Sequence, residues 1–161
     1  MTTIAVTKHE IAWDMMESMG NVKRISATDK VIVINGVIYG VAGDSEMCEH
    51  IPHWHAKGAK LKDLPEGDWE MLVVNDKGLH LYANEAPRGF PISFPFAIGS
   101  GGKFALVHLS NGMSAIDAVK KAAELDIYTG APFKSLNLSS VTIPKKKKLL
   151  LARKKKPAKK A

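Results

Sequence analysis

The chain has 161 residues, 45% of them apolar, which suits one domain with a single core. No stretch approaches the roughly eighteen uninterrupted apolar residues of a membrane span, and the N-terminus lacks the basic-then-apolar layout of a secretory signal. Cys48 is the only cysteine, which excludes an internal disulfide. We therefore expect a cytoplasmic protein without a transmembrane segment.

The formal net charge of +7 is unevenly distributed. Ten of the 23 Lys and Arg residues lie between Lys145 and Lys160, which leaves 13 basic and 16 acidic side chains, a net charge of −3, in residues 1–144. We expect a domain over residues 1–143 and a disordered basic tail over residues 144–161. Such a tail attracts nucleic acid without sequence preference. Alternatives are a solubilising role, or contact of residues 149–151 with an anionic membrane surface or a protein partner.

The first half of the chain is typical of strands. Residues 3–7 and 11–13 are short β-rich runs joined by a tight turn, so the sheet begins almost at the N-terminus. Residues 30–34 and 37–42 flank Asn35-Gly36, the strongest two-residue hairpin signal. A helix fits residues 44–57, although Pro52 should disturb it.

The second half adds strands at residues 69–74, 79–83 and 96–99, and then helices. Residues 102–109 are mostly apolar on all sides, which predicts a helix buried in the core. Ser114, with Asp117 three residues later, predicts the start of a further helix. Residues 136–143 return to strand. Strands first and helices late predict an α+β layered fold rather than a regular βαβ alternation.

The sequence begins Met1-Thr2-Thr3 and runs directly into a strand. Methionine before a small residue such as threonine is usually removed, which would leave a free α-amine beside the hydroxyl of Thr2. An α-amine has a reference pKa of about 7.7–8.0, so it can serve as base to its own hydroxyl. Met-Thr starts are common, so this start taken alone is better explained as an ordinary N-terminal strand.

Six motifs occur in order at residues 2–6, 11–14, 20–25, 40–43, 97–102 and 126–130. Together they resemble the motif series of proteasome β subunits and of the bacterial peptidase HslV, over residues 2 to about 141. The similarity is closest to short proteasome-like proteins of bacteria and phages. The resemblance implies the four-layer αββα sandwich of the Ntn hydrolases and threonine-type hydrolysis of peptides or unfolded proteins. It also implies a homo-oligomeric ring and a possible ATP-dependent unfoldase partner.

The residues that the resemblance assigns to catalysis are Thr2, Asp14, Arg24, Gly43, Ser100, Asp126 and Thr129. It makes Thr2 the nucleophile, Asp14 the anchor of a neighbouring positive charge, and the N–H of Gly43 an oxyanion donor. Ser100, Asp126 and Thr129 would surround the terminal amine. Each also has a structural explanation: Asp14 as a turn residue, Gly43 as a helix-entry glycine and Thr129 as a loop hydroxyl.

One position departs from the family pattern. Family members place a lysine immediately before an apolar residue on the strand, where this chain has Arg24 before Ile25, while Lys23 would point to the opposite face. Arg24 can pair with Asp14, but it cannot release its proton and needs more room than an ammonium. We expect weakened or lost activity, and the main alternative is a catalytically silent proteasome-like scaffold or binding protein.

Two further features bear on function. Asp44 either caps the next helix or adds negative charge beside the oxyanion position. Cys48, His50, His53 and His55 invite comparison with a metal site, but high-confidence zinc sites have tighter paired spacing, and these residues fall on the first surface helix of the family. We expect no metal and no cofactor.

Overall fold

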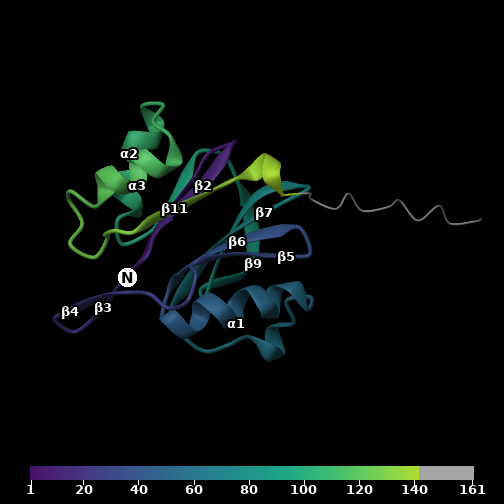
Figure 1. The fold of residues 1–161 in the computed structure, drawn as a ribbon. Helices are drawn as coiled ribbons and strands as arrows, with labels where there is room; N and C mark the ends of the chain where they lie inside the picture. Colours follow the sequence, from purple (N-terminus) through teal and green to yellow (C-terminus); the bar gives the residue numbers. More distant parts are fainter. Residues whose placement is uncertain (142–161) are drawn as a thin grey trace, which may run out of the picture.

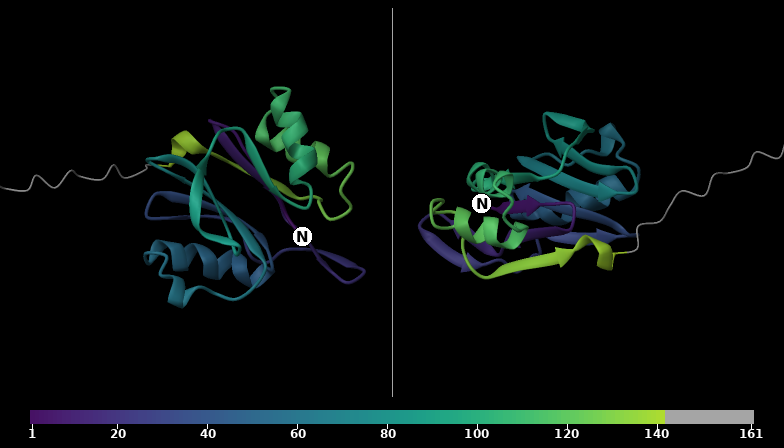
Figure 2. Two further views of the ribbon diagram at one scale, coloured as in Figure 1. Left: turned by 180° about the vertical axis from the view of Figure 1, so that it is seen from behind. Right: turned by 90° about the horizontal axis from the view of Figure 1, so that it is seen from above.

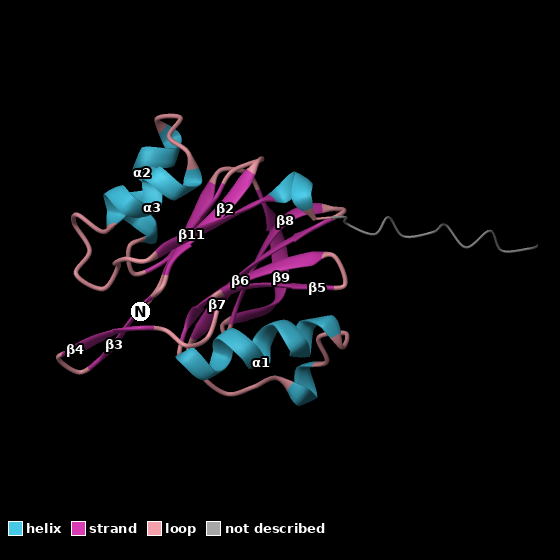
Figure 3. Cartoon of the chain, viewed as in Figure 1, coloured by secondary structure: helices cyan, strands magenta, loops and turns pink. Residues whose placement is uncertain are grey.

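The computed structural model describes residues 1–141 (Figures 1 and 3). These residues form eleven strands, three α-helices and two short 3-10 helices. The expected basic tail, and the end of the strand expected at residues 136–143, lie outside the described residues. Within residues 1–141, no helix is long and apolar enough to span a membrane.

One sheet has four antiparallel strands and holds the N-terminus. Its strands lie in the order β10 (Phe96–Gly99), β1 (Thr3–Val6), β2 (Glu10–Asp14) and β11 (Phe133–Asn137). Every residue of β1 is buried, because this central strand is covered on both faces. The first three of these strands match the expected segments, whereas β11 begins earlier than predicted and ends at Asn137, before the 3-10 helix η2 (Leu138–Ser140).

The second sheet has five antiparallel strands in sequence order. They are β5 (Val31–Ile34), β6 (Val37–Gly43), β7 (Trp69–Asn75), β8 (Gly78–Ala83) and β9 (Ala86–Ile92). The hairpin between β5 and β6 is confirmed, with Asn35 and Gly36 at φ angles of 51° and 76°, as its two-residue turn requires. Strand β9 was not predicted, because two prolines interrupt its sequence.

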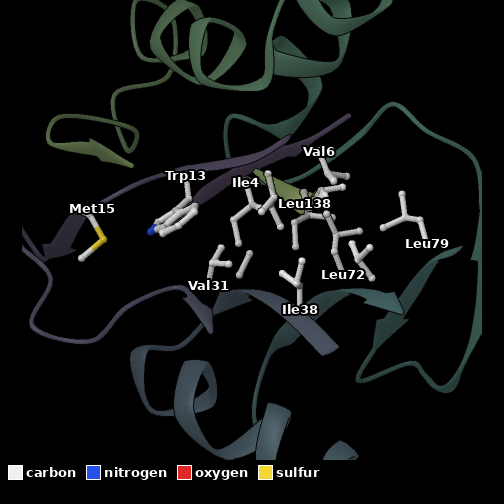
Figure 4. Close-up of a cluster of buried hydrophobic side chains, with 13 residues drawn as sticks. Ile4, Val6, Trp13, Met15, Val31, Ile38, Leu72, Leu79 and Leu138 are labelled. Carbon is white, nitrogen blue, oxygen red and sulfur yellow. The ribbon is translucent and has the colours of Figure 1, made fainter. Parts of the chain in front are cut away.

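The two sheets face each other across an apolar core (Figure 4). Ile4 and Trp13 of the four-stranded sheet meet Ile38 and Leu72 of the five-stranded sheet there. Gly40 lets the sheets approach closely, because a Cβ at this position would press on Ile4 at 3.2 Å. This packing holds β1, and therefore the N-terminus, in a fixed place.

Helices cover the outer faces of the two sheets (Figures 1 and 2). Helices α2 (Gly102–Ser110) and α3 (Ala115–Ala122) pack on β1 and β2, and α1 (Ser45–Ala56) packs on the five-stranded sheet. Ser114 caps α3 as predicted, accepting a hydrogen bond from the N–H of Asp117. Helix α1 continues through Pro52, which is buried against the sheet, so packing outweighs the lost backbone hydrogen bond. Helix α2 is less buried than expected, since Val107 is exposed.

A two-stranded hairpin, β3 (Met16–Met19) and β4 (Val22–Ile25), projects from the body beside the N-terminus (Figure 1). All four residues of β4 are exposed. No pattern in the sequence predicted this hairpin as a separate element. Its projection decides where Arg24 lies.

Candidate active site

The first residues of the chain are held between β10 and β2. The carbonyl oxygen of Thr2 accepts a hydrogen bond from the N–H of Ser100 at 2.9 Å, and Thr3 pairs with Gly99 in the sheet register. Gly99 has a φ angle of 88°, and a Cβ there would overlap the Thr2 carbonyl oxygen. Glycine is therefore required where β10 passes the start of β1.

The two neighbouring threonines have different environments. The hydroxyl of Thr3 forms a hydrogen bond with the hydroxyl of Thr129 and accepts another from the N–H of Gly101 at 3.0 Å. Among the described residues, the hydroxyl of Thr2 makes no hydrogen bond, and Thr2 lies beneath the exposed Met1. Thr3 is thus held by hydrogen bonds of its hydroxyl, whereas no described hydrogen bond holds the hydroxyl of Thr2.

Asp14 lies at the end of β2, fully buried, and accepts four hydrogen bonds. One carboxylate oxygen accepts the N–H of Thr3 at 2.8 Å and the ammonium of Lys30 at 3.1 Å. The other accepts the N–H groups of Met16 and Gly130, each at 3.2 Å. Burial raises the pKa of Asp14, while Lys30 and the backbone donors oppose this rise by stabilising the carboxylate.

Lys30 is the charged partner of Asp14, and the sequence motifs did not identify it. Its side chain is 4% exposed, and its ammonium donates to Asp14, to the carbonyl of Met16 at 2.7 Å and to the carbonyl of Met1 at 3.2 Å. Burial lowers the pKa of Lys30, and the Asp14 carboxylate opposes that effect. The signal was available, since Lys30 directly precedes the apolar strand β5, where a lysine is buried only with a partner.

The predicted pairing of Arg24 with Asp14 is wrong. Arg24 lies on the projecting β4 strand opposite Glu17, and its Nε donates to that carboxylate at 3.2 Å. Its side chain is 54% exposed, whereas Asp14 is fully buried and already holds Lys30. The motif at residues 20–25 was matched by its order in the sequence. In the structure it does not lie beside Asp14, because residues 16–25 form a separate hairpin outside the four-stranded sheet.

Ser100, Asp126 and Thr129 do come together, as one hydrogen-bonded network beside Thr2. One oxygen of Asp126 accepts the hydroxyls of Ser100 at 2.7 Å and Thr129 at 2.6 Å, and the other accepts the N–H of Tyr128 at 3.2 Å. Thr129 continues the network to Thr3. Three predicted residues from distant segments are therefore linked to the residue that follows Thr2.

Gly43 ends β6 and lines the same cavity as Thr2. Its φ angle is 142°, and a Cβ would overlap the Asp68 carbonyl oxygen, so the position suits glycine. Asp44 stands at the N-cap position of α1, but its side chain forms no capping hydrogen bond. Asp44 therefore occupies the expected capping position without making the capping hydrogen bond, and its side of the helix start lines the cavity.

A cavity of about 690 Å³ opens over Thr2. Its walls come from strand ends of both sheets. The five-stranded sheet contributes the end of β6, the start of β7 and the β8–β9 turn, and the four-stranded sheet contributes the end of β10. The lining residues are Met1, Thr2, Ser18, Ala42, Gly43, Asp44, Asp68, Trp69, Glu70, Ala83, Asn84, Glu85, Gly99 and Ser100. Thr2 therefore borders a space large enough for part of a peptide.

The residues considered for a metal lie elsewhere and separate from one another. The Cys48 thiol is buried and points to the carbonyl of Val41, and His55 meets the Tyr39 hydroxyl at 3.2 Å. His50 and His53 are exposed and line a second cavity, of about 550 Å³, along α1. Within residues 1–141, no group of His, Cys, Asp or Glu side chains is arranged to hold a metal ion.

No family model and no curated protein matches the sequence. The fold is similar to that of solved structures. The Thiobacillus denitrificans protein BPH, in complex with epoxomicin, matches with a TM-score of 0.67 and 19% identity, over 84% of this chain and 96% of that one. A second BPH structure matches with a TM-score of 0.66 and 20% identity, over 84% of this chain and 96% of that one. HslV from Trypanosoma brucei matches with a TM-score of 0.61 and 16% identity, over 84% of this chain and 97% of that one. At these identities the comparison establishes a proteasome-like fold.

Proposed function

We propose that this chain is a threonine-type peptidase with the αββα sandwich of the Ntn hydrolases, in which removal of Met1 exposes Thr2 as the nucleophile. One observation carries the proposal: Thr2, whose hydroxyl has no hydrogen bond among the described residues, lies between Met1 and Thr3, and both of these bond to the buried Lys30–Asp14 ion pair. Burying two charges at the start of a strand is costly for stability alone. Their position next to the terminus supports a catalytic use.

The buried ammonium explains why loss of Met1 matters. Lys30 has three donors, and one of them faces the carbonyl of Met1, which is attached directly to the nitrogen of Thr2. Removal of Met1 frees that donor and turns the nitrogen into an α-amine close to Lys30. A neighbouring ammonium disfavours a second positive charge, so the amine keeps its neutral, basic form.

The reaction proceeds in two transfers. The α-amine takes the proton of the Thr2 hydroxyl, whose oxygen attacks the peptide carbonyl carbon, and the N–H of Gly43 stabilises the resulting oxyanion. The C–N bond then breaks, the leaving amine takes the proton, and an ester on Thr2 remains. Water, deprotonated by the same amine, attacks the ester carbonyl, releasing the acid and restoring the Thr2 hydroxyl.

The other polar groups of the site act by position. Asp14 keeps Lys30 charged and in place, since four donors fix its carboxylate. Ser100, Asp126 and Thr129 hold the strand ends around the terminal amine. Arg24 has no part in this arrangement, because it lies on the exposed hairpin.

Assembly into a homo-oligomer is part of the proposal. Met19, Val22 and Ile25 of the projecting hairpin are each more than 60% exposed, at 63%, 62% and 65%. Exposed apolar side chains gathered on one element are typical of contact surfaces. A ring would confine the sites, and an ATP-dependent unfoldase would deliver unfolded protein. Mass photometry of wild type and of Val22→Lys tests the first statement: the variant should shift towards monomer, and equal masses would contradict a contact through this hairpin.

A silent scaffold or binding protein is the competing function. Its basis was the apparent replacement of the family's lysine by Arg24, whereas the buried Lys30 beside Asp14 supports the peptidase. The competing function predicts an intact fold that neither reacts at Thr2 nor turns over peptides.

Labelling of the terminus tests the proposed function. Intact mass should show that the purified protein lacks Met1, and epoxomicin, the compound bound to the Thiobacillus protein, should add one adduct at Thr2. Thr2→Ala should abolish the adduct, while Thr2→Ser, which keeps a hydroxyl, should retain it. A form with one extra residue fused before Thr2 should stay unlabelled. Labelling that persists in Thr2→Ala, or a wild type without Met1 that neither labels nor cleaves peptides, would refute the assignment.

A further inference from the structure

The cavity over Thr2 has an unusual charge. Four acidic residues line it, Asp44, Asp68, Glu70 and Glu85, and none of the described lining residues is Lys, Arg or His. They come from different elements: the β6–α1 junction, the segment before β7, strand β7 itself and the β8–β9 turn. The negative charge therefore lines the part of the cavity that the five-stranded sheet supplies.

Glu70 connects this charge to Thr2. Its Oε1 accepts the N–H of Gly99 at 2.6 Å, and Gly99 pairs with Thr3 and touches the carbonyl of Thr2. The Glu70 carboxylate is therefore held beside Gly99 in the cavity wall. Burial raises the pKa of Glu70, the Gly99 N–H opposes that rise, and Asp68 adds to it.

Within residues 1–141, these four carboxylates have no cationic partner. The ion pairs of the described chain use Asp14, Glu17, Asp29, Glu46, Asp117 and Glu124. Uncompensated charge inside a concave, partly desolvated site focuses a negative potential and attracts a cation. A metal ion is a poor match, because the carboxylates do not converge to a metal-binding geometry.

We propose that the cavity selects peptides with Lys or Arg at the residue whose carbonyl Thr2 attacks. This inference rests on the proposed function. A side chain next to the attacked carbonyl enters the cavity, because Thr2 and Gly43 both lie in its wall. A long basic side chain would place its methylenes along Ala42 and Ala83, which pair with Glu70 in the sheet, and its charge at Glu70, while the exposed Asp68 and Glu85 add negative charge. Acidic side chains are repelled.

Turnover of matched fluorogenic tripeptides tests the preference, with Lys, Arg, Leu or Glu at the residue before the cleaved bond. Wild type should show kcat/KM for Lys and Arg about tenfold above Leu, with Glu lowest, as expected for one charge-assisted contact. Glu70→Gln keeps an acceptor for the Gly99 N–H but removes the charge, so the Lys-to-Leu ratio should fall towards one. Glu66→Gln is the matched control, since Glu66 is exposed and does not line the cavity, and its ratio should equal that of wild type.

Two arms separate this inference from the proposed function. If epoxomicin labels Thr2 but Leu peptides are cleaved as well as Lys peptides, the inference fails and the function stands. If Thr2 is unreactive, the proposed function fails, and calorimetry on Thr2→Ala decides the charge preference with tripeptide amides ending in Lys or Leu. Tighter binding of the Lys amide that is lost in Thr2→Ala/Glu70→Gln supports the preference, and equal binding of the two amides overturns it.

Discussion

At the scale of single residues, the site depends on one buried ion pair. Asp14 has four donors and Lys30 has three acceptors, so each charge is compensated only while the other is present. A buried pair of this kind contributes little net stability, but losing one member leaves a buried charge unpaired. The consequences of substitution should therefore be much larger at Lys30 than at any surface lysine.

Lys30→Met should unfold in urea with a free energy about 3–5 kcal/mol lower than wild type, because the buried Asp14 keeps its backbone donors but loses its counter-charge. It should also abolish labelling of Thr2. Arg24→Met is the matched control, and its stability should stay within about 0.5 kcal/mol of wild type, since solvent screens an exposed ion pair. Loss of labelling in Arg24→Met with normal labelling in Lys30→Met would reverse the assignment of the two cations.

The two neighbouring threonines should separate function from stability. Thr3→Val leaves the N–H of Gly101 without its acceptor and interrupts the network at Thr129, which costs about 1–3 kcal/mol for a buried donor. Thr2→Val removes a hydroxyl that makes no described hydrogen bond, so unfolding should change little while peptide turnover disappears. Thermal melts and turnover of both variants check this, and a large melting shift in Thr2→Val would show a structural role for its hydroxyl.

The Glu70 carboxylate should lower the stability of the fold at neutral pH but not at acidic pH. Its pKa is raised in the folded state, so the fold penalises the carboxylate at pH values above that folded pKa, and the penalty vanishes below the ordinary glutamate value of 4.5. Glu70→Gln should therefore melt above wild type at pH 7, and the difference should disappear towards pH 4. The groups that face Glu70 are Asp68 and the Gly99 N–H. A constant difference across this range would show that the charge is not the cause.

At the scale of elements, the sequence predicted regular segments well and projecting ones poorly. The Asn35-Gly36 hairpin and the Ser114-capped helix have local signals, a two-residue turn and a cap, which act over a few residues. The β3–β4 hairpin and β9 have weak apolar alternation, because they lie at the surface or contain prolines. Their positions depend on tertiary packing, which no local pattern encodes.

The candidate site divides along the same line. Five of the predicted residues lie at strand ends or next to helices, and the structure brings them together: Thr2, Asp14, Ser100, Asp126 and Thr129. The missing cation could not be chosen from the motif alone, since Lys23, Arg24 and Lys30 all follow β2 and precede β5. Only the projection of the hairpin excludes the first two.

The passage of β10 against β1 should be the most sensitive joint between elements. Gly99→Ala places a Cβ against the carbonyl of Thr2, in addition to the cost of a positive φ angle of 88°. Gly112 is a matched control, because its φ angle is 85° and a Cβ added there would meet no atom within 4 Å. Both alanine variants should lose about 1 kcal/mol from backbone strain, but only Gly99→Ala should also lose labelling of Thr2. Equal effects in urea unfolding and labelling would mean that the close approach is unimportant.

At the scale of the whole molecule, the cavity and the last described residues lie far apart. The N-terminus lies at one end, and η2, just before residue 142, lies at the other, as the views in Figures 1 and 2 agree. The charge is divided along the sequence, with a net −3 over residues 1–144 and ten basic residues between 145 and 160. Peptide cleavage and any binding of nucleic acid should therefore be separable by shortening the chain.

Truncation after Pro144 should abolish binding of mixed nucleic acids and leave peptide turnover unchanged. For the full chain, six to ten phosphate contacts would make affinity fall by about 10³–10⁵ between 50 and 200 mM salt, because each contact releases counterions. A full-length variant with the ten basic residues of 145–160 changed to Gln keeps the length while removing the charge, so it should behave like the truncated chain in gel shifts. Binding that persists after truncation would have to come from residues 1–144, whose net charge of −3 repels phosphate. It would require local contacts such as those of the second cavity, whose lining includes Lys57 and Lys60 as well as Asp63. Reduced peptide turnover in the truncated chain, with the charge-free full-length variant still active, would instead indicate that the length of the segment supports the assembly that holds the site.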